Sequence, residues 1–134
     1  RLPVTGRWRA DVPASPTCIR PALKGPLMPH VDVRHSADLA VDPRLFDWIE
    51  AEILRHDPGA GDSKARAYPA AVFHHTHCHV AVSLLPKPHR NEAFTQALLA
   101  ALDGGIPRFL GGPCAFSLDL TYSGAAYITR HHTG

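Results

Sequence analysis

The chain of 134 residues is long enough for one domain, and with 45% hydrophobic and 19% charged residues it is too apolar to remain disordered. Its formal net charge is +2, but residues 1–27 hold five basic residues and one acidic residue, so the remainder carries 2 − 4 = −2. This distribution, the absence of a run of about 20 apolar residues and the lack of a visible secretory pattern argue against nucleic-acid-binding, membrane-spanning and secreted proteins. Three cysteines are too few for a disulfide framework, so we expect a cytoplasmic protein. From the charge distribution and the lack of a long apolar run, we expect no nucleic-acid or membrane partner.

Residue 28 is an expected boundary. Residues 1–27 contain five of the thirteen prolines and show no regular period, and proline at this density breaks helices and strands. Met28 is the only methionine, and regular patterning begins directly after it. We therefore expect translation to start at Met28, residues 28–134 to form the folded domain and residues 1–27 to be a leader outside the native folded protein. A genuine N-terminal arm that packs on a neighbouring molecule is the alternative.

The first half of this domain predicts a strand, a helix and a second strand. Residues 30–35 alternate apolar and polar side chains, as a half-buried strand does. Asp42 is a suitable N-cap for an amphipathic helix over residues 43–56, whose apolar positions follow helical spacing. Residues 64–73 predict the second strand, interrupted at Pro69.

The second half repeats this order. Residues 77–85 predict a strand that is mostly buried. Asn91 is the expected N-cap of a helix over residues 92–102, which a glycine pair at 104–105 should end. Residues 115–122 alternate again and predict another strand.

The order of these elements predicts an α+β fold made of two βαβ halves. Right-handed crossovers would give a four-stranded mixed sheet with both helices on one face. A short further strand at residues 127–128 is also expected. We expect the second face of the sheet to carry bare valines and leucines, an apolar patch that oligomerisation would cover.

Three short segments carry a resemblance to a known family. They are residues 28–30 (Met-Pro-His), directly followed by a strand, residues 64–66 (Lys-Ala-Arg), and residues 84–90 (Leu-Leu-Pro-Lys-Pro-His-Arg), followed by an amphipathic helix. Together they resemble the tautomerase superfamily, in which the initiator methionine is removed and proline becomes the first residue. Within it they are similar to the 5-carboxymethyl-2-hydroxymuconate isomerases, which have two arginines one residue apart and another arginine before the second helix.

The resemblance implies a two-repeat tautomerase fold and a homotrimer with its active site between subunits. It implies that Pro29 is the catalytic base of an isomerase or tautomerase that needs no cofactor or metal. The implied substrate is an unsaturated 2-hydroxy or 2-oxo dicarboxylate, similar to 5-carboxymethyl-2-hydroxymuconate, from the bacterial breakdown of aromatic compounds. Arg66, Arg90 and Lys64 are the implied substrate-binding residues, although Lys64 stands where the family has an arginine.

The chemistry gives a reason for each of these residue types. A free N-terminal proline is a secondary amine, and burial and nearby cations lower its pKa toward neutrality, where a general base works best. Arginine binds carboxylates with two hydrogen bonds, a geometry that lysine cannot reproduce. With residues 1–28 attached, the nitrogen of Pro29 is an amide and cannot act as a base.

A histidine-rich segment at residues 74–79 suggests a rival function. In a strand, His75, His77 and His79 would share one face, but three imidazoles in line suit no tetrahedral metal site well. We therefore favour a polar strand that faces an interface or a pocket wall, without a metal. The alternatives are another tautomerase-superfamily activity (phenylpyruvate tautomerase, dehalogenase or hydratase) and a trimeric binding or metal-sequestering protein that uses this segment.

Overall fold

The computed structural model describes residues 29–134. The folded unit ends at Tyr127, and residues 128–134 belong to a separate unit without helix or strand. The strand predicted at residues 127–128 is therefore wrong, because two adjacent apolar residues are too short a signal to specify one. The predictions for residues 1–27 and for Met28 lie outside the described residues.

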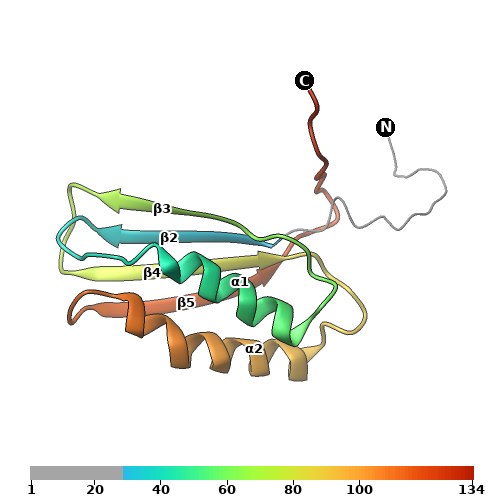
Figure 1. Cartoon of the computed structure of the whole chain (residues 1–134), viewed down its shortest axis with the longest axis horizontal. Coiled ribbons are helices and arrows are strands. Elements are labelled where there is room, and N and C mark those ends of the chain that lie inside the picture. Colours follow the sequence, from blue (N-terminus) through green and yellow to red (C-terminus); the bar gives the residue numbers. More distant parts are fainter. Residues whose placement is uncertain (1–28) are drawn as a thin grey trace. The chain divides into compact units, whose positions relative to one another are not determined.

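The folded unit consists of two βαβ halves. In chain order its elements are β2 (His30–Ser36), α1 (Arg44–His56), β3 (Lys64–Ala70), β4 (His77–Leu84), α2 (Glu92–Gly105), a 3₁₀ turn (Ile106–Phe109) and β5 (Ala115–Tyr122). Within the described residues the strands form one four-stranded sheet in the order β3-β2-β4-β5. β3 is parallel to β2, β5 is parallel to β4, and the central β2 and β4 are antiparallel. Both helices lie on one face of the sheet (Figure 1), so the predicted fold is confirmed.

The core lies between the sheet and the two helices. The alternation of β2 and β4 directs one set of side chains toward the helices. Helices α1 and α2 direct apolar side chains toward the sheet at intervals of about one turn. Each such side chain contributes roughly 1.5–3 kcal/mol through burial. The fully buried members are Val31, Val33, Leu45, Ile49, Ile53, Val80, Val82, Leu98 and Leu102.

Cys78 belongs to this buried face of β4 and is 1% exposed. Burial, assisted by the nearby Cys114, raises the pKa of its thiol to about 11. Cys78 and Cys114 are free thiols in the part of the chain that the structure describes. No helix in that part is long and apolar enough to span a membrane.

The second face of the sheet is polar, and the prediction of a bare apolar face is wrong. β2 and β4 are buried on one face only, so the alternation that directs their valines to the helices directs charged and imidazole side chains to the open face. Neighbouring strands place polar residues beside one another here, as Asp32 beside Arg66 and Arg34 beside His79. The polar side chains of the open face include His30, Asp32, Arg34, Lys64, Arg66, Tyr68, His77, His79, Ser117 and Asp119.

The ends of the elements follow local chemistry. Asn91 is the N-cap of α2 as predicted, since its side-chain oxygen accepts a hydrogen bond from the Phe94 N–H at 2.9 Å. Asp42 accepts one from the Arg44 N–H at 3.0 Å, although α1 begins one residue later than expected. Pro69 does not interrupt β3, because β3 is an edge strand whose outer N–H positions need no partner.

Helix α2 extends to Gly105, beyond its predicted end. A Cβ atom on Gly105 would lie 2.0 Å from Cζ2 of Trp48 in α1, whereas one on Gly104 would meet nothing within 4 Å. Gly105 therefore allows the two helices to approach closely, and it is also the last residue of α2, as predicted for the glycine pair at 104–105.

The two glycines give a matched test of this packing. We expect Gly105→Ala to lower the free energy of unfolding by about 1–3 kcal/mol, because the indole of Trp48 must move. Gly104→Ala should be neutral or stabilising by up to about 1 kcal/mol, because alanine is the better helix former. Urea unfolding measures both, and equal effects would contradict the packing role of Gly105.

Candidate active site

Pro29 lies at the start of β2, an interior strand, and its ring is fully buried. Its carbonyl oxygen accepts a hydrogen bond from the Lys64 N–H at 2.9 Å, at the start of β3. On the other side, His30 pairs with Ser83 near the end of β4. Pro29 therefore lies at the end of the sheet where β3 begins and β4 ends, and the loops at that end flank it.

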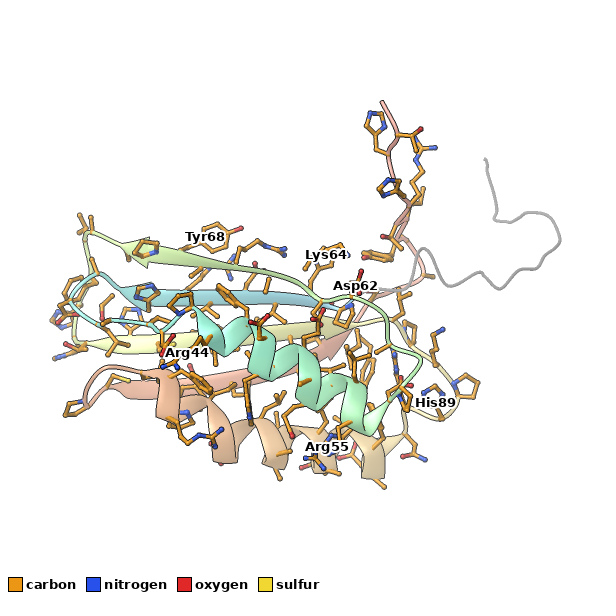
Figure 2. All side chains as sticks on the ribbon, viewed as in Figure 1. Arg44, Arg55, Asp62, Lys64, Tyr68 and His89 are labelled. Carbon is orange, nitrogen blue, oxygen red and sulfur yellow. The ribbon has the colours of Figure 1, made fainter. Side chains whose placement is uncertain are left out.

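Lys64 and Arg66 leave β3 on the open face of the sheet, and Figure 2 shows Lys64 pointing away from the two helices. Nε of Arg66 donates to Oδ1 of Asp32 at 2.6 Å, and its Nη2 lies 3.1 Å from Nδ1 of His30. The Arg66 side chain remains 37% exposed. The ammonium of Lys64 is exposed and has no hydrogen bond or ion pair with the residues described. The structure thus brings Lys64 and Arg66 together beside the start of β2.

His30 lies beside both cations, paired with Lys64 across the strands and 3.1 Å from Nη2 of Arg66. Burial lowers the pKa of its imidazole, the charges of Arg66 and Lys64 lower it further, and Asp32 acts in the opposite direction. His30 is therefore largely neutral at pH 7, and the positive charge of this group comes from Lys64 and Arg66.

Arg90 is held inside the protein. Its side chain is 4% exposed, with Nε at 2.8 Å and Nη2 at 2.5 Å from Oδ2 of Asp57, and Nη1 donates to the Leu85 carbonyl oxygen at 2.6 Å. Arg90 therefore links the C-terminal end of α1 to the loop after β4. Its role as a carboxylate ligand stays a prediction, and a substrate would have to share the guanidinium with Asp57.

Asp57, which directly follows α1, was not among the predicted site residues, and it holds Arg90 through its carboxylate. Burial raises the pKa of its carboxyl group, but the hydrogen bonds and charges of His89 and Arg90 outweigh burial, so the net pKa is lowered. Nε2 of His89 lies 3.0 Å from the same Oδ2 atom. Figure 2 shows His89 near the last turn of α1.

Lys87 lies in the same loop and was not among the predicted site residues. Its carbonyl oxygen accepts a hydrogen bond from the Arg90 N–H at 2.9 Å, and its side chain is partly buried. Burial and the charge of Arg90 lower the pKa of its ammonium, while Asp57 acts in the opposite direction. This ammonium has no hydrogen bond or ion pair within the described part of the chain.

Ser63, directly before Lys64, was also missed. Its N–H donates to a carboxylate oxygen of Glu50 at 2.7 Å, while its own hydroxyl is buried without a hydrogen-bond partner among the described residues. No pattern in the sequence marks such an atom.

The histidine-rich segment lies at the other end of the sheet, where β4 begins. His75 is in the preceding loop with φ +66°. The prediction that it shares a strand face with His77 and His79 is therefore wrong. The rings of His74 and His75 pack together, with centroids 4.0 Å apart. Among the described residues, no three His, Cys, Asp or Glu side chains are arranged to hold a metal ion. The metal-sequestering alternative therefore gains no support from this geometry.

Comparison with known proteins gives a similarity of fold. No protein-family model matches the sequence, and no curated protein matches it. A structure of a 5-carboxymethyl-2-hydroxymuconate delta-isomerase matches with a TM-score of 0.67 and 14% identity, covering 82% of this chain and 92% of that chain. A 5-carboxymethyl-2-hydroxymuconate isomerase from Deinococcus radiodurans R1 matches with a TM-score of 0.61 and 17% identity, covering 83% and 94%.

A third solved structure extends the similarity. It is described as a "Q0 fused 4-OT wild type symmetric trimer" and matches with a TM-score of 0.54 and 17% identity, covering 75% of this chain and 94% of that chain. The chain therefore has the fold of these proteins. This confirms the fold that the resemblance to the tautomerase superfamily implied.

Proposed function

We propose that this protein is a cofactor-independent isomerase of the tautomerase type. Its substrate is an unsaturated 2-hydroxy or 2-oxo dicarboxylate similar to 5-carboxymethyl-2-hydroxymuconate. Its general base is Pro29, which becomes the N-terminus when Met28 is removed from the domain over residues 28–134. The observation that carries the proposal is the place of Pro29, which is buried at the end of an interior strand and hydrogen-bonded to Lys64. The shared fold of the two isomerase structures supports it.

In this mechanism the Pro29 amine accepts a proton from the substrate, either from the 2-hydroxyl group or from a carbon beside the 2-oxo group. The electron pair left behind spreads over the conjugated system as a dienolate, and the protonated amine returns the proton to another carbon. The net reaction is a shift of one proton and one double bond. Lys64 and Arg66 beside Pro29 favour the neutral amine and stabilise the negative charge of the dienolate.

The substrate carboxylates require cations, and the proposal assigns Lys64, Arg66 and Arg90 to them. Lys64 and the exposed part of Arg66 are available as described, whereas Arg90 acts only where Asp57 shares its guanidinium. Lysine offers one charge without the bidentate geometry of arginine, so a looser carboxylate site is expected at Lys64.

We further propose a homotrimer that acts in the cytoplasm in the breakdown of aromatic compounds. The fold shared with a structure described as a symmetric trimer supports this assembly. Within the described residues the outer edges of β3 and β5 pair with no further strand, which leaves them available to neighbouring subunits.

The proposal is tested with a protein that begins at Pro29, checked by intact mass. We expect it to isomerise 5-carboxymethyl-2-hydroxymuconate, which has a third carboxylate on its carboxymethyl group, with a higher kcat/KM than for phenylenolpyruvate, which has one carboxylate. Both reactions are followed by ultraviolet absorbance. The full chain of 134 residues, in which Pro29 is an amide, should be inactive. A preference for phenylenolpyruvate would transfer the proposal to a related tautomerase, and inactivity toward both substrates would refute it.

A further inference from the structure

The loop between β4 and α2 holds two cations, Lys87 and Arg90, close to one carboxylate, that of Asp57. Arg90 and His89 both bind Oδ2 of this carboxylate, so its negative charge is already shared. The ammonium of Lys87 forms no ion pair with any of the described residues.

The positions of Arg90 and Lys87 differ in what they allow. Arg90 is buried and engaged at all three guanidinium nitrogens, so it fixes the loop to the end of α1. Lys87 is only partly buried and its ammonium makes no hydrogen bond or ion pair among the described residues. A partly desolvated ammonium beside a second cation gains most from an added anion, because water and neighbouring carboxylates compensate its charge least.

The strand order places the loop that holds Lys87 on the opposite side of Pro29 from β3, where Lys64 lies. The strand order is β3-β2-β4, with Lys64 at the start of β3, Pro29 at the start of β2 and the Lys87 loop directly after β4. Adjacent strands lie about 4.8 Å apart, so the flanking strands are about 10 Å apart across Pro29. The two lysines therefore belong to segments on either side of Pro29, so that a ligand with a carboxylate at each end could contact both.

We infer that Lys87, in place of Arg90, is the residue that binds one carboxylate of the dicarboxylate, with Lys64 at the other, and that Arg90 is a positioning residue for the Lys87 loop. This inference rests on the proposed function and deepens it. It explains how the chain can recognise a dianion although its arginine before α2 is occupied by Asp57.

The test separates binding from catalysis. Adipate, a saturated six-carbon dicarboxylate, and hexanoate, its monocarboxylate counterpart, are titrated by calorimetry into the protein that begins at Pro29, whose sheet, helices and core all lie within residues 29–127. Lys87→Gln should weaken adipate binding by about tenfold or more and leave hexanoate within about twofold. Lys87→Arg, which keeps the charge, should retain adipate binding within about threefold.

Arg44→Gln is the matched control, because it removes one positive charge from the exposed pair with Asp42 at the other end of α1. In kinetics, Lys87→Gln should raise KM for the dicarboxylate by a larger factor than it lowers kcat. Equal adipate binding by Lys87→Gln and Arg44→Gln, an equal loss of adipate and hexanoate, or no adipate binding by the unsubstituted protein would each overturn the inference. Adipate binding that depends on Lys87 in a protein without activity would support it while refuting the proposed function.

Discussion

One glycine placed before Pro29 is expected to lower kcat/KM for the dicarboxylate by about 10²–10⁴-fold relative to the protein that begins at Pro29. The added residue turns a secondary amine into an amide, which has no basic lone pair, while every side chain stays the same. The measurement is the initial isomerisation rate of two preparations that differ by one residue, each verified by intact mass. Circular dichroism and thermal unfolding should be unchanged.

A second substitution distinguishes a base from a structural proline. Pro29→Ala in the protein that begins at this position keeps a free primary amine, so it should retain more activity than the glycine-extended protein. The activity that Pro29→Ala loses relative to its parent reflects the missing proline ring, which fixes the direction of the lone pair. If the glycine-extended protein were as active as its parent, Pro29 would not be the base, whatever the activity of Pro29→Ala.

The largest effect on stability is expected from Asp57→Ala, which should lower the free energy of unfolding by about 3–5 kcal/mol. The substitution leaves the Arg90 guanidinium, 4% exposed, without its charge partner in the interior. Urea unfolding at pH 7 measures this loss. The control is Asp42→Ala, which breaks an ion pair at the other end of α1 in which Arg44 is 81% exposed, so it should cost much less than Asp57→Ala.

The pair with Arg90 also predicts a dependence on pH. The pKa of Asp57 is lower in the folded protein than in the unfolded chain. Its contribution is therefore complete above the unfolded pKa, about 3.9, and is lost as pH falls through the folded pKa. The stability difference between the protein and its Asp57→Asn variant should shrink below about pH 4. Removal of both charges in Asp57→Asn with Arg90→Met should recover part of the loss, and no recovery would mean that Arg90 is not the source of the cost.

Much of the fold is legible in local patterns. The alternation of β2 and β5 and the side-chain cap at Asn91 depend on neighbours a few residues away, so the sequence predicts them well. Gly105 shows the limit of such signals. The glycine pair correctly predicts where α2 stops, but it does not predict that Gly105 must stay small because of Trp48, which lies on the other helix.

The site was predicted less completely, because its contacts join distant segments. Pro29, Lys64 and Arg66 follow from motifs, and the register of β2 and β3 brings them together. The carboxylate that engages Arg90 comes from 33 residues earlier in the chain, and no spacing rule connects the two. The polar open face was missed for a related reason, since a count of apolar residues does not say which face of a strand they occupy.

The buried thiol of Cys78 can be used to detect opening of the core by chemical labelling. Thiol reagents attack the thiolate, and with a pKa of about 11 only about one thiol in a thousand is ionised at pH 8. Because the side chain is also 1% exposed, modification requires the sheet to separate from the helices. The rate at which Cys78 is alkylated under native conditions therefore reports how often the core opens, without the introduction of a further cysteine.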